Sequence, residues 1–367
     1  MTVFSVHGAP SEYILKDNAL DLLEAKLLER NLRRVLVVRG KKSWEAVKPY
    51  WPQMAEVELE EYTYGGECSF AEIEAVTKLV KHHSLDAVIG VGGGKILDLV
   101  KAVCDATERQ SILIPTLASN CSPWTPLSVI YDDSGAFIRY DIYPVCTSLV
   151  LVEPQILVDA PIEMVIAGIG DTLAKWYEAD VQMVVIDNKT VPLQIAHFAA
   201  RECKDLLLKF ARGAVEAAKA GEVNDDFVKV VETIIMFGGM VGGYGDYYGR
   251  IAGAHSIHNG LTVLEETHHA LHGDKVAYGI LVQLVLEDKW TEIEELRLFY
   301  EELGLPLSLT DLGVEDITEA LIAEVAEKAT VTGESIHVMS IGLVTAERVV
   351  EAIQKLEQFV CESEKSC

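Results

Sequence analysis

The chain has 367 residues, of which 50% are hydrophobic, so it can bury a sizeable core in two or three domains. Its formal net charge of -26 repels phosphate backbones, which argues against nucleic acid or an anionic membrane as the main partner. No apolar run approaches the roughly 20 residues that span a bilayer. The opening MTVFSVHGAPSEYIL lacks a secretory signal, and we expect a cytoplasmic protein.

Cysteine usage also indicates a reducing compartment. The seven cysteines are scattered, odd in number and never spaced as CxxC, which favours reduced thiols over disulfides or a cysteine zinc site. They are Cys68, Cys104, Cys121, Cys146, Cys203, Cys361 and Cys367.

Up to about residue 160, short apolar runs alternate with helical stretches, which predicts a parallel sheet covered by helices. The expected strands are residues 33–40, 85–94, 110–116 and 148–154, and the expected helices are 20–30, 41–50, 70–84 and 95–107. Residues 122–144 carry a turn signal at Asp133, Ser134 and Gly135 with alternating flanks, which predicts a hairpin. We interpret residues 60–69, EEYTYGGECS, as a loop.

After Pro161 the pattern changes to helical periodicity that continues to the end, with no convincing strand. The expected helices are 162–180, 192–220, 225–241, 250–263, 274–289, 291–303, 315–328 and 345–361. We therefore place a domain boundary near residue 160. An α/β domain (residues 1–160) precedes an all-helical domain (residues 161–367).

The first motif that carries chemistry is VIGVGGGKILD, residues 88–98, where a strand runs into three glycines and then a helix. Glycines let the backbone approach a ligand closely, and the first helical N–H groups favour an anion. The run is not a P-loop, because Ile89 and Ile96 stand where glycine and Ser/Thr belong. It also departs from the usual dinucleotide fingerprint, since Lys95 occupies the sixth place. A tight turn without a ligand is the alternative.

Histidines crowd into residues 255–272, HSIHNGLTVLEETHHALH, which hold five of the ten in the chain. His255 and His258 lie one turn apart on a predicted helix, and His272 starts the next helical stretch. Two imidazoles plus a carboxylate suit zinc or iron and leave a position open for substrate. A lone histidine is usually structural, so we expect only two of the five to be ligands. HExxH is absent, which argues against a zincin protease.

A third motif is GIGDTLAKWYEA, residues 168–179. Here Asp171 follows a glycine-rich turn, and we expect it to begin an amphipathic helix. Taken alone, this position favours an N-terminal capping role, in which aspartate is common.

Together the motifs resemble the glycerol-dehydrogenase-like branch of the iron-containing (group III) alcohol dehydrogenases. The resemblance covers essentially the whole chain through the blocks GVGGGKILDLVKAV, ILIPTLAS, PLSVIY, GIGDTLAKWYEA and AHSIHNGLTVLEETHHALHGDKVAYGILVQ. It implies a Rossmann-like N-terminal domain, a helical C-terminal domain as in the dehydroquinate synthase-like fold, and an active site in the cleft between them. It also implies that Asp171, His255 and His272 bind one divalent metal, Zn(II) or Fe(II), which acts as a Lewis acid.

The same resemblance implies the other site residues and partners. His258 would line the substrate site rather than bind metal. NAD or NADP would carry the hydride, the substrate would be a small molecule, and the protein would be a homo-oligomer. The implied cofactor residues are Gly92, Gly93, Gly94, Lys95 and Asp98 near the pyrophosphate, and Thr116, Ser119, Thr125, Leu127 and Tyr131 near the nicotinamide.

Two departures from the glycerol dehydrogenase pattern concern the substrate. Where those enzymes carry STDAP, this chain has Cys121 in place of the aspartate that receives polyol hydroxyls. Lys175 stands where a small neutral residue is usual, one turn after Asp171; it is either a receptor for a substrate carboxylate or a surface lysine paired with a nearby carboxylate. With the run CSPWTPLSV, these departures resemble the hydroxycarboxylate dehydrogenase A subgroup, which implies reduction of 2-oxo acids. Glycerol oxidation is the alternative.

Arg39, Gly40, Lys41 and Lys42 stand where NAD-preferring members place an aspartate for the ribose hydroxyls. A carboxylate would repel a 2′-phosphate, whereas Arg or Lys would hold it, so we predict a preference for NADP(H). The alternative is that these are solvated residues at the start of a helix.

The sequence gives less support to two other classes of function. A lyase of the dehydroquinate synthase type needs several basic residues around a phosphorylated substrate, and few lie near the histidines. A catalytically silent binding protein is disfavoured because all three metal-ligand candidates are present.

Overall fold

The computed structural model describes residues 5–133 and 135–364. By its internal contacts the chain divides into two compact units. The sheet unit consists of His7–Ile162 and Glu216–Met240, and the helical unit consists of Glu163–Val215, the chain from Val241 onward and the residues up to Val6. Residues 216–240 thus join the sheet unit although they lie beyond the expected boundary near residue 160, which itself stays a prediction.

The sheet unit is built on a six-stranded sheet in the order β1-β8-β5-β4-β2-β3, in which every pair is parallel. The inner strands are apolar runs, and β4 and β8 are buried along their whole length, as expected for strands covered on both faces. The four strands expected outside the hairpin are confirmed. The bounds are β1 (Tyr13–Leu15), β2 (Arg34–Arg39), β3 (Glu58–Thr63), β4 (Ala87–Gly92), β5 (Gln110–Pro115) and β8 (Leu149–Val152).

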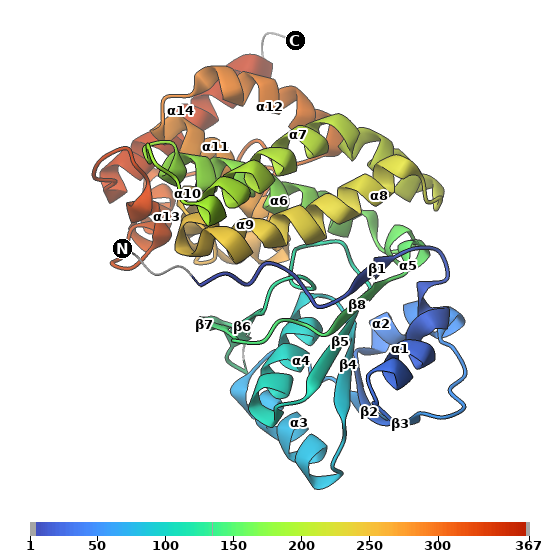
Figure 1. Ribbon diagram of the computed structural model, residues 1–367. Coiled ribbons are helices and arrows are strands. Elements are labelled where there is room, and N and C mark those ends of the chain that lie inside the picture. The colour runs from blue at the N-terminus through green and yellow to red at the C-terminus, as the bar shows by residue number, and fades with distance from the viewer. Residues whose placement is uncertain (1–4, 134, 365–367) are drawn as a thin grey trace. The chain divides into compact units, whose positions relative to one another are not determined.

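Helices cover both faces of this sheet: α3 and α4 lie on one face, and α1 and α2 lie on the other (Figure 1). The core beneath α1 joins Leu23 and Leu27 to Val35, Ile89 and Ile112 of the sheet. This arrangement is the predicted Rossmann-like fold. The helices are α1 (Leu23–Glu29), α2 (Lys41–Val47), α3 (Phe70–His82), α4 (Gly94–Thr107) and α5 (Pro154–Val158), with the short turns η1 (Ala19–Leu22) and η2 (Lys48–Tyr50).

The interpretation of residues 60–69 as a loop is wrong for residues 60–63, which belong to β3. This strand pairs in parallel register with β2 at the edge of the sheet. Its residues, Glu-Leu-Glu-Glu-Tyr-Thr, are all exposed or half-buried, so it lacks the apolar run that marks the inner strands. Ion pairs from Arg34 to Glu58 and from Arg39 to Glu61 link it to β2.

The predicted hairpin is confirmed as a separate antiparallel sheet of β6 (Leu127–Tyr131) and β7 (Phe137–Ile142). Ser134, part of the expected turn signal, lies outside the described residues, and so does Cys367. Ser128 and Ile130 are buried, and the hydroxyl of Ser128 donates to the carbonyl of Asp98 on α4 at 2.6 Å. The hairpin is therefore anchored through β6.

Among the described residues, every strand lies before Glu153, and the predicted change to helical structure is confirmed. A π-helical segment interrupts the helix expected at 225–241. The helices are α6 (Ile162–Met183), α7 (Val191–Ala220), α8 (Asp225–Glu232), α9 (Gly238–Gly245), α10 (Gly253–Leu261), α11 (His272–Leu286), α12 (Trp290–Leu303), α13 (Glu319–Ala329) and α14 (Ala346–Glu364), with the short segments η3 (Thr233–Phe237, the π segment), η4 (Asp246–Gly249), η5 (Glu265–His269) and η6 (Ser335–Val338).

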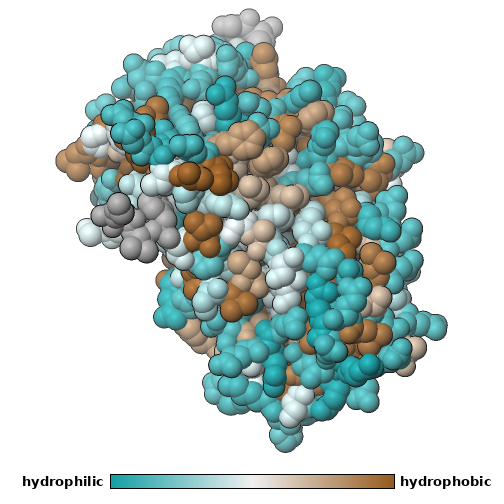
Figure 2. Space-filling model, in the orientation of Figure 1, coloured by the Kyte–Doolittle hydropathy of each residue, from teal (hydrophilic) through white to brown (hydrophobic). Residues whose placement is uncertain are grey.

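One helical stretch, Asp225–Gly249, is long and apolar enough to cross a membrane by length and composition alone, although the sequence analysis does not identify it. Inside the protein, 61% of its apolar window is buried, as in a core helix. Figure 2 shows mostly hydrophilic residues on the face drawn, with apolar residues in scattered patches. The absence of a membrane partner therefore stays a prediction.

Two glycines bring α6 and α11 into direct backbone contact. A Cβ added at Gly273 would lie 1.8 Å from the carbonyl oxygen of Ala167, and one added at Gly170 would lie 2.7 Å from the carbonyl oxygen of Gly273. Only glycine fits at such separations. Because Asp171 follows Gly170 and His272 precedes Gly273, this crossing sets the distance between two candidate metal ligands.

Replacing Gly273 with alanine should force the two helices apart. The added methyl group meets a backbone carbonyl that cannot rotate away, so we expect Gly273→Ala to lower the free energy of unfolding by about 1–3 kcal/mol, measured in urea. Gly242→Ala is the matched control, because its added Cβ would come no closer than 3.8 Å to its neighbours and alanine favours a helix. Wild-type stability in Gly273→Ala would contradict the close crossing.

Candidate metal centre and cofactor-binding turn

Asp171 lies in the interior of α6, so the expectation that it begins a helix is wrong, and a capping role is excluded with it. The preceding Gly170 serves the crossing with α11 rather than a turn. The side chain of Asp171 is buried, and its Oδ1 atom has no hydrogen-bond partner within the described part of the chain. A buried carboxylate oxygen without a donor is unfavourable, which indicates a place for a positive partner.

Two histidine rings face that oxygen. Nε2 of His255, on α10, and Nε2 of His272, the first residue of α11, each lie 3.4 Å from Oδ1 of Asp171. Two donors that are each about 2.0–2.1 Å from a tetrahedral ion are roughly 3.3 Å from one another, so this spacing fits a shared cation. One ligand atom from each residue lies within 4.8 Å of the others. The structure thus brings the three predicted ligands together as a possible metal site.

A buried carboxylate, Glu178, holds His255. It accepts hydrogen bonds from the backbone N–H groups of Ala252 at 2.7 Å and of His255 at 2.9 Å. Its second oxygen lies 2.7 Å from Nδ1 of His255. Because an ionised carboxylate can only accept, Nδ1 of the neutral ring must carry the proton, and Nε2 presents its lone pair toward Asp171. Glu178 therefore fixes the tautomer that metal ligation requires.

A chain of three residues holds His272. Its Nδ1 lies 2.9 Å from Nε2 of His258, whose Nδ1 lies 3.1 Å from Oδ1 of Asn259. The amide nitrogen of Asn259 donates to both carboxylate oxygens of Glu334, so the amide oxygen faces His258. His258 therefore carries its proton on Nδ1 and accepts at Nε2, which leaves Nε2 of His272 for a metal. The predicted substrate contact of His258 stays a prediction.

Lys175, one turn after Asp171 on α6, is half-buried and acts on the site through its charge. Burial raises the pKa of Asp171, but the charge of Lys175 and the neighbouring histidines outweigh it and hold that pKa well below its usual range. For His255, burial lowers the pKa, while the charge of Glu178 and the contact with Asp171 raise it to about 9. The charge of Lys175 acts on nearby carboxylates under either interpretation of this residue, so its contact with a substrate stays a prediction.

Three residues of this site escape the sequence analysis: Glu178, Asn259 and Glu334. Glu178 does carry a signal, because its position seven residues after Asp171 places both on one face of a helix, two turns apart. Glu334 carries none, since it lies in a segment without periodicity between α13 and α14.

In the sheet unit, the glycine-rich turn lies where the strand order reverses. The chain passes from β2 to β3 in one direction and then to β4 on the other side of β2, which is where doubly wound sheets bind dinucleotides. Gly92 ends β4, and α4 begins at Gly94 with Gly93 as its N-cap and no capping side chain. An added Cβ would lie 2.9 Å from Leu117 at Gly93 and 2.9 Å from Asn120 at Gly94. The turn thus presents backbone N–H groups, as an anion site requires.

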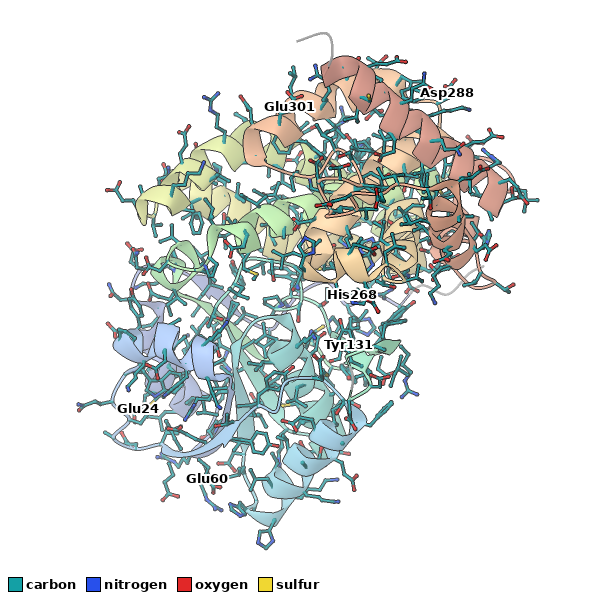
Figure 3. The ribbon with its side chains drawn as sticks, turned by 180° about the vertical axis from the view of Figure 1, so that it is seen from behind. Glu24, Glu60, Tyr131, His268, Asp288 and Glu301 are labelled. Atoms are coloured by element: carbon teal, nitrogen blue, oxygen red, sulfur yellow. The ribbon has the colours of Figure 1, made fainter. Side chains whose placement is uncertain are left out.

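The two basic cofactor candidates are paired with carboxylates. Arg39, the last residue of β2, donates to Glu61 at 2.9 and 2.5 Å. Lys95 contacts both oxygens of Glu67 at 2.6 Å and lies 4.8 Å from the ring centroid of Tyr131, which is labelled in Figure 3. A phosphate at either position would have to compete with the carboxylate already there.

Asp98, predicted near the pyrophosphate, is buried among protein groups. Its carboxylate accepts from the hydroxyl of Ser122 at 2.6 Å and the N–H of Val129 at 2.9 Å, and it pairs with Lys101 at 2.9 Å. Lys101, which the sequence analysis misses, also donates to the carbonyls of Ser122 and Thr125. The structure gives Asp98 a positioning role for this segment, and its contact with a cofactor stays a prediction.

The remaining candidates follow β5 or start β6. Thr116 is buried, and its N–H donates to the carbonyl of Gly92 at 3.1 Å. Ser119 and Cys121 are half-buried, and the carbonyl of Cys121 accepts from the N–H of Thr125 at 3.3 Å. Their predicted roles toward nicotinamide and substrate, with that of Leu127, stay predictions.

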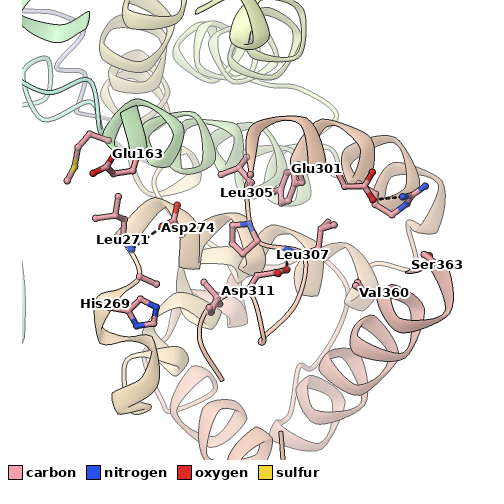
Figure 4. A pocket seen from close by; sticks show the side chains of 17 residues that line it. Glu163, His269, Leu271, Asp274, Glu301, Leu305, Leu307, Asp311, Val360 and Ser363 are labelled. Atoms are coloured by element: carbon pink, nitrogen blue, oxygen red, sulfur yellow. Dashed lines mark hydrogen bonds and ion pairs between the residues drawn. The ribbon is translucent and has the colours of Figure 1, made fainter. Parts of the chain in front are cut away.

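A cavity of about 870 Å³ also lies within the helical unit (Figure 4). None of the three candidate metal ligands lines it. Three of its acidic groups have protein partners: Asp311 accepts from two backbone N–H groups, Glu301 pairs with Arg297, and Asp274 caps α11. We assign it no role.

Comparison with known proteins agrees with this geometry. Residues 10–154 match the sequence profile of the family described as Iron-containing alcohol dehydrogenase. The chain is 35% identical to hydroxycarboxylate dehydrogenase A of Escherichia coli, over 95% of this chain and 96% of that protein. It is 37% identical to a glycerol dehydrogenase of Thermotoga maritima, over 89% of this chain and 90% of that protein.

Comparison with solved structures identifies a similar protein of the same kind. The crystal structure of a probable glycerol dehydrogenase from Sinorhizobium meliloti superposes with a TM-score of 0.86 at 32% identity, covering 97% of this chain and 99% of that one. The predicted resemblance and fold are confirmed. The chain belongs to the iron-containing alcohol dehydrogenase family, in its glycerol dehydrogenase branch.

Proposed function

We propose that this protein is a metal-dependent, NAD(P)-linked oxidoreductase that interconverts a 2-oxo acid and a 2-hydroxy acid. The observation that carries the proposal is the unpartnered buried oxygen of Asp171, flanked at 3.4 Å by Nε2 of His255 and of His272. One carboxylate and two imidazoles suit Zn(II) or Fe(II) and leave a position for substrate. Membership in the family supports oxidation and reduction at a CH–OH group.

The proposed substrate class rests on two residues and one relative. Lys175, whose charge already acts on Asp171, would attract a substrate carboxylate to the metal site. Cys121 replaces an aspartate of the glycerol dehydrogenase pattern and so removes a charge that would repel such an anion. The relative with 35% identity is a hydroxycarboxylate dehydrogenase, and we extend that class to this chain.

Glycerol oxidation is the second candidate, because the relative from Thermotoga maritima is a glycerol dehydrogenase. A polyol site must bond each substrate hydroxyl, and a missing acceptor at Cys121 would weaken such a site.

The proposed cofactor residues lie in the sheet unit. The turn formed by Gly92, Gly93 and Gly94 would bind the pyrophosphate at the start of α4. Arg39, with Lys41 and Lys42 on the first turn of α2, would meet a 2′-phosphate, which favours NADP(H). The pairing of Arg39 with Glu61 reduces but does not cancel this local positive charge.

When bound, the metal supplies Lewis acidity toward the substrate oxygen, and the nicotinamide supplies or accepts the hydride. The side chains of the protein hold the geometry. Glu178 and His258 keep Nε2 of His255 and of His272 directed at Asp171. Burial and the charges of the neighbouring histidines hold the pKa of His258 well below its usual value, so His258 stays neutral and able to accept from its neighbour.

Metal analysis and a substrate screen test the function directly. We expect about one Zn or Fe ion per chain and loss of activity on chelation, because the buried donor set suits one cation. With 2-oxobutanoate or 2-oxoglutarate, NADPH should be oxidised faster than NADH, and glycerol should be oxidised slowly. Clearly faster glycerol turnover would select the second candidate, and full activity without metal would overturn the site.

Neutralising Lys175 should reveal the substrate carboxylate. A charge-assisted hydrogen bond contributes about 1.5–3 kcal/mol, so Lys175→Met should lower kcat/KM for 2-oxobutanoate roughly 10- to 100-fold. For propanal, which has no carboxylate, the decrease should be much smaller. Lys355→Met removes an exposed lysine as the control. An equal loss on both substrates would argue against carboxylate recognition.

Glu178→Gln should weaken metal binding. Glutamine offers one acceptor oxygen where Glu178 receives three donors, so the orientation of His255 is lost, and we expect a decrease in metal affinity of about 10- to 100-fold. Competition with a chelator measures this affinity without an activity assay. Glu357→Gln is the control, because Glu357 bonds Tyr278 and the N–H of Leu309 instead. Unchanged metal affinity in Glu178→Gln is the contrary result.

A further inference from the structure

The strand β7 (Phe137–Ile142) leaves one edge of its two-stranded sheet without a partner strand among the described residues. Its large apolar side chains are exposed: Phe137 by 59%, Ile138 by 44%, Tyr140 by 43% and Ile142 by 41%. An exposed apolar edge strand is a ready template for pairing with another chain. Figure 1 shows β6 and β7 as a pair separate from the six-stranded sheet.

The backbone of β7 has its free groups at this edge. The N–H of Tyr143 bonds the carbonyl of Pro126, and the register pairs Ser128 with Asp141, so alternation directs the N–H and C=O of Tyr140 and Ile142 away from β6. The outer edge of β6 is different, because two of its N–H groups have partners. The N–H of Val129 donates to the carboxylate of Asp98, and that of Tyr131 donates to the carbonyl of Cys68.

The charges of β7 match an identical strand in one register. Arg139 and Asp141 flank Tyr140 and pair with each other at 2.8 Å along the strand. If a second copy runs antiparallel with its Tyr140 opposite Tyr140, each Arg139 faces Asp141 of the other copy, and each Ile138 faces Ile142. Moving the centre by one residue sets Arg139 against Arg139 or Asp141 against Asp141, and like charges directly opposite are destabilising.

We infer that β7 pairs with β7 of a second copy of this chain, centred on Tyr140, to make a four-stranded sheet across a two-fold axis. The same patch serves both copies, as a two-fold interface requires. The four-stranded sheet does not extend further through β6, because the N–H groups of Val129 and Tyr131 at its outer edge already have partners. A register shift between Ile130 and Tyr131 ends the regular pairing of β7 near Ile138 and keeps the shared segment short.

A charge-swap experiment tests this pairing. Arg139→Asp gives a strand with two acidic residues, and Asp141→Arg gives a strand with two basic residues, so each variant repels its own copy. By light scattering over a dilution series, we expect each variant alone to raise the dissociation constant of the dimer by at least about 10-fold, and the equimolar mixture to restore it. Pairing within one chain cannot produce this rescue, because neither variant carries opposite charges in its strand.

Arg33→Asp is the control, since Arg33 is an exposed residue of the sheet unit whose ion pair is with Glu56. A second test is independent of charge. In the inferred register Tyr140 lies opposite itself, with a Cα separation of about 5.5 Å that a disulfide can span. Tyr140→Cys should therefore form a cross-linked dimer on oxidation, and Phe137→Cys should form far less.

Three results would overturn the inference. The first is a wild-type protein that is monomeric at every concentration. The second is an assembly whose mass neither charge variant changes. The third is cross-linking of Tyr140→Cys no greater than that of the wild-type cysteines.

Discussion

The candidate metal centre depends on one buried carboxylate, that of Asp171. Its Oδ1 atom faces the imidazole rings of His255 and His272 and has no hydrogen-bond donor among the described residues. Removing Asp171 from water is unfavourable unless positive charge compensates. Lys175 supplies part of that charge, yet Oδ1 stays without a donor in the described part of the chain. In the proposed metal-bound state the cation supplies the remainder, so metal binding and the stability of α6, α10 and α11 are linked. The glycine contact between α6 and α11 keeps the ligands at a separation that a small ion can bridge.

In the sheet unit the charges are reversed: basic side chains lie near a turn that suits an anion. Arg39 and Lys95 lie beside a turn suited to an anion, and each forms an ion pair, with Glu61 and Glu67 respectively. A bound phosphate would replace the carboxylate beside each basic side chain. The net binding free energy is then the difference between a base–phosphate pair and a base–carboxylate pair. Because exposed pairs contribute little, such an exchange is easy. In the proposed cofactor complex, affinity would then rest mainly on the backbone N–H groups of the glycine-rich turn, and the basic side chains would select between NAD and NADP.

Elements and residues that produce a local sequence pattern could be predicted from the sequence. The inner strands are apolar runs, and the histidines of the metal site are dense enough to stand out. β3 could not be predicted, because backbone pairing with β2 holds it in place while its side chains stay exposed. The periodicity predicts a helix over 162–180 that contains Asp171, but the neighbouring glycines, which serve helix packing, are interpreted as a turn before Asp171. Glu334 could not be found at all, since it meets Asn259 across 75 residues of sequence.

The two candidate histidine ligands are anchored unequally, and this inequality suits the proposed site, which must admit substrate. The side chain of His255 is 13% exposed and rests on the ionised, buried Glu178. The side chain of His272 is 50% exposed and rests on the neutral ring of His258. A hydrogen bond to an ionised acceptor is roughly twice as strong as a neutral one, so α6 and α10 hold the firmer pair of ligands. In the proposed metal-bound state, substrate exchange would therefore disturb His272 before Asp171 and His255.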